Sequence, residues 1–79
     1  MDQKYAVNEE RIKEVENIYT YHAPSIDQQE RYIFIREVAK HLAAAIEQSC
    51  PPSREKALAH TNLEQAVMWA NASIARNEK

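Results

Sequence analysis

Apolar residues near the start of the chain recur at the spacing of helical turns. Asn8 can cap a helix whose first turn holds two acidic residues, where negative charge is favoured. The apolar stripe behind this cap is narrow and consists of Ile12, Val15 and either Ile18 or Tyr19. We therefore predict a helix over residues 8–20 and a flexible segment over residues 1–7. A helix this short is stable only when it is docked.

A second apolar stripe follows a break at Pro24, which disfavours helix at the residue before it. Ser25 or Asp27 can cap the next helix, because both begin a reciprocal capping pattern. The stripe runs at steps of three and four residues through Tyr32, Ile35, Ala39, Leu42 and Ile46. It predicts a helix over residues 27–49, ended by two prolines.

The third stripe predicts a helix over residues 53–76, with Ser53 as its cap. Its expected inner row is rich in small side chains and consists of Ala59, Leu63, Ala66, Ala70 and Ser73. Small residues let two helix backbones approach closely, which favours an antiparallel hairpin with the preceding helix. The expected fold is thus all-α, a single domain over residues 1–79 with a helical hairpin and a short N-terminal helix.

Further apolar residues lie outside this expected seam. They are Phe34 and Val38 on one helix and Leu58, Trp69 and Ala72 on the other. A chain of 79 residues forms only a marginal core of its own. Burial against other copies is the economical solution, so we expect a homo-oligomer.

The composition of the chain argues against several classes of function. The sequence has no glycine, which excludes the glycine-rich phosphate loops of Rossmann and Walker type. A net charge of -2 gives no general attraction to DNA or RNA. The single cysteine and three isolated histidines indicate neither a disulfide framework nor a metal site, and a reducing cytoplasmic setting fits best. No apolar run is long enough to span a membrane.

The residues also indicate no enzyme: no nucleophile stands in a catalytic motif, so we expect neither catalytic residues nor a cofactor. Tyr21 differs from the apolar residues of the helices because it lies in a connector and not on an apolar stripe. Its ring there can either plug the end of the hairpin or stack on a purine. Arg31 and Arg36 have guanidinium forks that suit phosphate oxygens, although solvated ion pairs are their ordinary role. Lys40 is by default solvated or in a local ion pair, and Arg76 by default meets the last helical carbonyls.

Three stretches of the chain resemble a known family. They are Thr20-Tyr21-His22-Ala23-Pro24, Gln29-Glu30-Arg31-Tyr32 and, most specifically, Met68-Trp69-Ala70-Asn71-Ala72. Together they are similar to the small phage-encoded sponges of anti-CBASS defence, which trap cyclic oligonucleotide messengers. The resemblance covers roughly Ile18 to Glu78.

This resemblance implies a compact homohexamer that binds cyclic dinucleotides between protomers and cyclic trinucleotides at separate sites, without cleaving them. It implies Tyr21 as the stacking aromatic, Arg36 as a phosphate contact and Arg76 in the trinucleotide site. The full set of expected ligand-binding residues is Tyr21, His22, Pro24, Arg31, Arg36, Lys40, Asn71 and Arg76. The expected location is the cytoplasm of the infected bacterial host.

Two other hypotheses remain open from the residues themselves. A helical adaptor or regulator could use the exposed apolar faces to bind a host protein. A nucleic-acid binder is disfavoured by the balance of 12 acidic against 10 basic residues. Stabilisation by cyclic dinucleotides on heating would distinguish a sponge from an adaptor.

Overall fold

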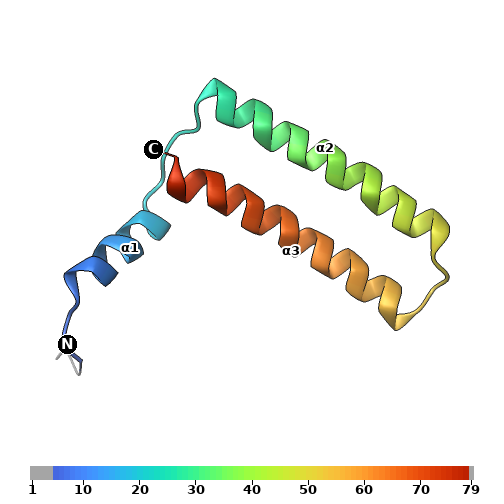
Figure 1. Cartoon of the computed structure of the whole chain (residues 1–79), viewed down its shortest axis with the longest axis horizontal. Coiled ribbons are helices and arrows are strands. Elements are labelled where there is room, and N and C mark those ends of the chain that lie inside the picture. Colours follow the sequence, from blue (N-terminus) through green and yellow to red (C-terminus); the bar gives the residue numbers. More distant parts are fainter. Residues whose placement is uncertain (1–4, 79) are drawn as a thin grey trace.

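The computed structural model describes residues 5–78, which form three α-helices and no strand. The helices are α1 (Glu9–Tyr19), α2 (Ile26–Ser49) and α3 (Arg54–Asn77). Helices α2 and α3 run antiparallel as a long hairpin, and α1 lies at the end of the hairpin where α2 begins and α3 ends (Figure 1). The predicted all-α fold with a hairpin and a short N-terminal helix is confirmed.

Each helix begins at a side-chain cap. The Asn8 side chain accepts hydrogen bonds from the backbone amides of Glu10 and Arg11. Ser25 caps α2 in a complete capping box with Gln28, so α2 begins one residue before the expected start. Ser53 caps α3 through the amide of Lys56. Residues 5–7 have no regular structure, and the rest of the segment expected to be flexible, residues 1–4, lies outside the described residues.

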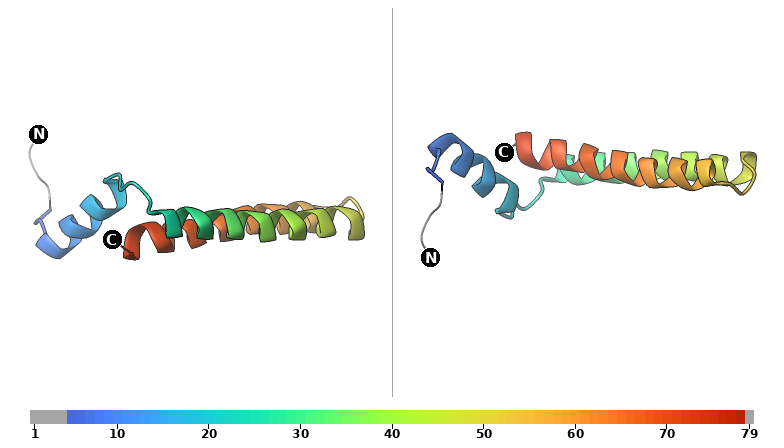
Figure 2. Two further views of the ribbon diagram at one scale, coloured as in Figure 1. Left: turned by 90° about the horizontal axis from the view of Figure 1, so that it is seen from above. Right: turned by 90° about the horizontal axis from the view of Figure 1, so that it is seen from below.

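The hairpin is a single layer of two helices (Figure 2). Its radius of gyration is 17.8 Å, whereas a compact chain of this length has about 12 Å. Among residues 5–78, Ile74 is the one apolar side chain classed as buried, at 9% exposure. The protomer therefore buries little of its own apolar surface.

The inner row of the hairpin departs from the prediction at two positions on α3 and at one position on α2. On α3 the partly or fully buried row is Ala59, Leu63, Val67, Ala70 and Ile74, while Ala66 and Ser73 are exposed. On α2 Ala43 lies inside and Leu42 is exposed. A straight helix drifts away from a strict heptad stripe, which explains why the buried position is the next residue along the chain at each of these places.

Inner-row and exposed apolar residues of α2 and α3 together line an open groove along one side of the hairpin, the apolar groove. Its lining is almost wholly hydrophobic and consists of Phe34, Ile35, Val38, Ala39, Leu42, Leu63, Ala66, Val67 and Ala70. Phe34 is 67% exposed and Trp69, outside this groove, is 59% exposed. Truncation of Trp69 would therefore remove core packing only if the ring is covered in an assembly.

Polar contacts from Glu47 to Lys56 and His60 join α2 to α3 beside the turn between them. We call this group of contacts the Glu47 staple. The carboxylate of Glu47 accepts contacts from Lys56 Nζ at 3.1 Å and His60 Nε2 at 3.0 Å. Lys56 Nζ also donates to the backbone carbonyl of Glu47 at 3.1 Å. The hydrogen bond from Lys56, followed by that from His60, lowers the pKa of Glu47 below its ordinary value of 4.5.

This staple predicts acid sensitivity. A carboxyl whose pKa is lowered by folding stabilises the fold above its unfolded pKa, and this contribution is lost as the pH falls through the folded pKa. We expect the melting temperature to fall on acidification below pH 4.5, and Glu47→Gln to reduce that dependence while lowering stability at neutral pH. Circular dichroism melts across this range measure both. Glu37→Gln, an exposed change on the same helix, is the control; equal acid dependence in both variants would contradict the role of the staple.

The apolar groove predicts self-association, since exposed surface of this kind gains free energy on burial. We expect light scattering to give a multiple of the 9.2 kDa protomer mass. Phe34→Glu should shift the population toward the protomer, because a carboxylate would be desolvated in the interface. Tyr19→Glu is the control: it replaces an exposed ring on α1 with the same charged side chain and should preserve the assembly. A wild-type protein at the protomer mass would refute this expectation.

Candidate functional site

A wide hollow lies where the connector between α1 and α2 meets the end of α3. We call it the connector hollow; its volume is about 710 Å³, within the range of small-molecule sites. Four of the predicted site residues line it: Tyr21, His22, Pro24 and Arg31. The rest of its lining comes from Ala23, Ser25, Asp27, Gln28, Tyr32, Ala75 and Glu78.

Local hydrogen bonds fix the path of the connector into α2. Pro24 leads to the cap at Ser25, whose amide donates to Gln28 Oε1 at 3.0 Å. In turn, the backbone amide of Gln28 donates to Ser25 Oγ at 3.1 Å. Gln29 Nε2 also donates to the carbonyl of Pro24 at 3.2 Å. These bonds place the preceding residues of the connector beside the hollow.

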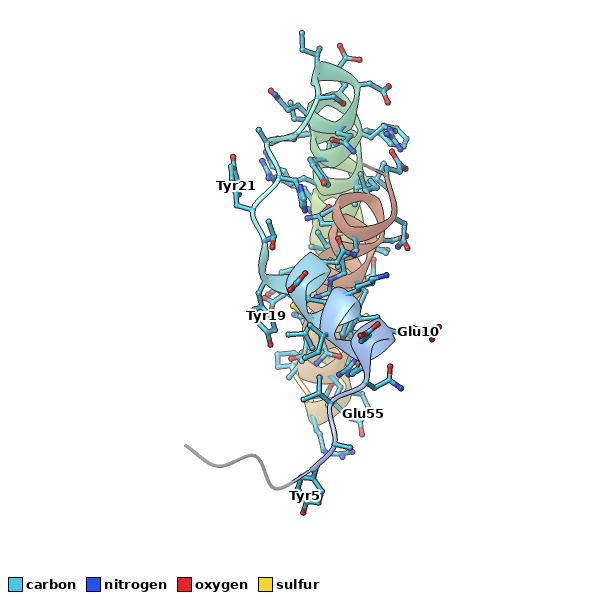
Figure 3. The ribbon with its side chains drawn as sticks, turned by 90° about the vertical axis from the view of Figure 1, so that its left-hand side faces the viewer. Tyr5, Glu10, Tyr19, Tyr21 and Glu55 are labelled. Atoms are coloured by element: carbon cyan, nitrogen blue, oxygen red, sulfur yellow. The ribbon has the colours of Figure 1, made fainter. Side chains whose placement is uncertain are left out.

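The ring of Tyr21 is the exposed aromatic group of the connector hollow. It is 84% exposed and points away from the helices (Figure 3). A ring exposed to this extent can stack on a nucleobase. Tyr19, at the end of α1, is similarly exposed but does not line the connector hollow.

Arg31 provides the basic group of the connector hollow. Its Nη1 and Nη2 lie 2.8 and 2.5 Å from the two carboxylate oxygens of Glu78, a two-pronged ion pair. Its Nε also donates to Asp27 Oδ2 at 3.1 Å, one turn earlier on α2. The hydrogen bond with Glu78 is the main reason that the pKa of Arg31 is raised, and the same bond lowers the pKa of Glu78.

Two further hydrogen bonds hold the end of α3 in place. Gln28 Nε2 donates to the carbonyl of Glu78 at 2.8 Å. Asn17 Nδ2, from α1, donates to the carbonyl of Arg76 at 3.0 Å. The end of α3 is thus tied to both α1 and α2, although these segments are far apart in the sequence.

Arg76 lies closer to Tyr21 than its sequence position indicates. Both residues line a smaller hollow of about 300 Å³, together with Asn17, Thr20, His22, Pro24, Tyr32 and Ala75. The Arg76 guanidinium carbon is 6.0 Å from the centre of the Trp69 ring, a distance at which a cation is attracted to an aromatic face. Within one protomer the structure therefore brings together the residues expected at two different ligand sites.

Arg36 and Lys40 lie at another place on the hairpin. They line a central hollow of about 370 Å³ with Ala39, Ala43, His60, Leu63, Glu64 and Val67. This central hollow shares no lining residue with the connector hollow. One protomer therefore does not bring Arg36 and Tyr21 into the same hollow.

Asn71 lines none of these three hollows. Its side-chain oxygen is buried, as is that of Asn17, and neither oxygen has a hydrogen-bond partner among residues 5–78.

Sequence reasoning did not identify Glu78 and Gln28 as site residues. The spacing of Asp27 and Arg31, four residues apart on one helix, was a usable signal for an ion pair. The pair between Arg31 and Glu78 has no such signal, because 47 residues separate its partners.

The arrangement offers contacts for a ligand with aromatic and anionic parts. It combines an exposed ring, a histidine and a guanidinium around an open hollow, and the guanidinium is paired with the carboxylates of Glu78 and Asp27. Among residues 5–78, no group of three potential ligands is placed to hold a metal ion. No helix in that range is long and apolar enough to cross a membrane.

The fold and these hollows define a helical-hairpin protein with surfaces suited to a ligand. Residues 10–75 match the family model described as Acb2/Tad1, hairpin domain. The chain therefore belongs to this family, the anti-CBASS sponges that its sequence resembles. The comparisons with curated proteins and with solved structures gave no match.

Proposed function

We propose that this protein binds cyclic dinucleotides and cyclic trinucleotides and releases them unchanged, so that a CBASS effector is not activated. Family membership over residues 10–75 is the observation that carries this proposal. The connector hollow supports it, because the ligand's bases need an aromatic face and its phosphates need a basic group. Such a sponge acts by mass action in the cytoplasm of the infected bacterium and requires tight binding, not turnover.

The assembly is part of this proposal. In the homohexamer that we propose, other copies cover the apolar groove, and the connector hollow of one copy lies near the central hollow of another. Tyr21 could then supply stacking while Arg36 and Lys40 of a second copy supply positive charge. Arg76 is assigned to the cyclic trinucleotide site at a different junction of protomers, with Asn71 on the same helix.

Heating with a panel of cyclic oligonucleotides tests the function without knowledge of the preferred member. A ligand that binds only the folded protein raises its melting temperature in proportion to the logarithm of ligand concentration. We expect stabilisation by at least one cyclic dinucleotide. A helical adaptor for a host protein would show none across the panel, and that outcome would contradict the sponge proposal.

Tyr21→Ala should weaken cyclic dinucleotide binding by about 1 to 3 kcal/mol for each stacked base. Tyr19→Ala is the matched control, since it removes an equally exposed ring two residues earlier and outside the connector hollow. Isothermal titration calorimetry measures both, after size-exclusion chromatography has shown that each variant keeps its assembly. Equal affinity in the two variants would refute stacking on Tyr21.

Arg36→Ala and Arg76→Ala should separate the two ligand classes. Loss of Arg36 should cost cyclic dinucleotide binding about 1.5 to 3 kcal/mol, the value of a hydrogen bond to a charged group. Loss of Arg76 should instead weaken the binding of cyclic trinucleotides. Titration of both variants with both ligands measures the division. Because Arg76 and Tyr21 line one hollow within the protomer, equal weakening of both ligand classes by Arg76→Ala would show a single shared site.

A further inference from the structure

The guanidinium that faces the connector hollow is already occupied by a group of the same chain. Both terminal nitrogens of Arg31 contact the Glu78 carboxylate, at 2.8 and 2.5 Å. Glu78 itself lines the hollow. A carboxylate and a phosphate present paired oxygens of similar spacing to the same two donors, so both cannot occupy the fork at once.

The charges around Arg31 also oppose an incoming anion. Asp27 contacts the same guanidinium, with its Oδ2 2.9 Å from Nη2. Two carboxylates therefore surround one positive charge, which leaves a local excess of negative charge. Departure of Glu78 alone would remove this excess and free Nη1 fully and Nη2 in part, while Asp27 would still hold the guanidinium in place through Nε and Nη2.

We propose that Glu78 is an internal competitor for the phosphate site at Arg31 and thereby sets the affinity of the connector hollow. This inference rests on the proposed function, because it takes the displacing anion to be a phosphate of a cyclic oligonucleotide. The carboxylate occupies the fork in the free protein and leaves when the ligand arrives. A ligand must therefore gain enough from other contacts, such as stacking on Tyr21, to displace it.

The position of Glu78 allows this movement at small cost. The residue follows the last turn of α3, and its side chain is 43% exposed. Its backbone is held independently, since its amide donates to the carbonyl of Ile74 at 3.1 Å and its carbonyl accepts from Gln28 at 2.8 Å. Rotation of the side chain can therefore free Arg31 without unwinding α3.

Glu78→Gln tests the competition, because it keeps the size of the side chain and removes its charge. The affinity for a cyclic dinucleotide should rise by about two- to fivefold, the range expected from the strength of exposed ion pairs. Glu37→Gln changes the net charge equally on the exposed surface of α2 and should leave the affinity unchanged. Calorimetric titration at one fixed ionic strength compares the wild type with both variants.

Testing Glu78→Gln in a second protein background, Arg31→Ala, separates competition for the guanidinium from general electrostatic repulsion of the ligand. In Arg31→Ala protein the fork is absent, so adding Glu78→Gln should produce little further gain. An equal gain with and without Arg31 would overturn competition at the fork and indicate long-range electrostatics. A loss of affinity in Glu78→Gln, with the assembly intact, would instead mean that Glu78 positions Arg31 for the ligand.

The two proposals fail in different ways. If the wild type binds its ligand and Glu78→Gln binds it no more tightly, the competitor role is wrong and the sponge function stands. If neither the wild type nor Glu78→Gln binds any cyclic di- or trinucleotide, the proposed function and the competitor role both fail. Binding by Glu78→Gln alone would support both, with the carboxylate as the barrier.

Discussion

The thin core of the hairpin is the constraint on which the rest of the structure depends. Two helices in one layer cannot cover each other on every side, and Ile74 is the one apolar side chain of residues 5–78 that reaches the buried class. Apolar side chains such as Phe34 therefore remain open to solvent. Burial between copies is the largest source of stability still open to this chain, so assembly and function are expected to be coupled.

Because the seam between α2 and α3 buries little apolar surface, polar contacts hold the ends of the helices in place. The Glu47 staple ties the turn between α2 and α3. At the other end Asn17 and Gln28 hold the last residues of α3. The connector hollow lies at this second end, so the contacts that close the hairpin also shape the candidate site. This explains why Glu78, the last of the described residues, can influence a group on α2.

Features governed by nearby residues could be predicted from the sequence, and features governed by packing could not. The cap and partner at Ser25 and Gln28 are three residues apart, so the start of α2 was among the predicted alternatives. The inner rows were predicted less well, because the heptad stripe drifts from the true contact face. The meeting of Arg76 with Tyr21 and of Arg31 with Glu78 depends on how the helix ends come together in space.

Native mass spectrometry of the protein with a cyclic dinucleotide tests the central claim most directly, because one spectrum gives the number of protomers, the number of ligands and the mass of each ligand. We predict a homo-oligomer, with six protomers as the expected number, that carries whole-number additions of the intact cyclic dinucleotide. Release from the complex should return that same mass. A 9.2 kDa protomer with no bound ligand, or a complex that returns a linear product, would contradict it.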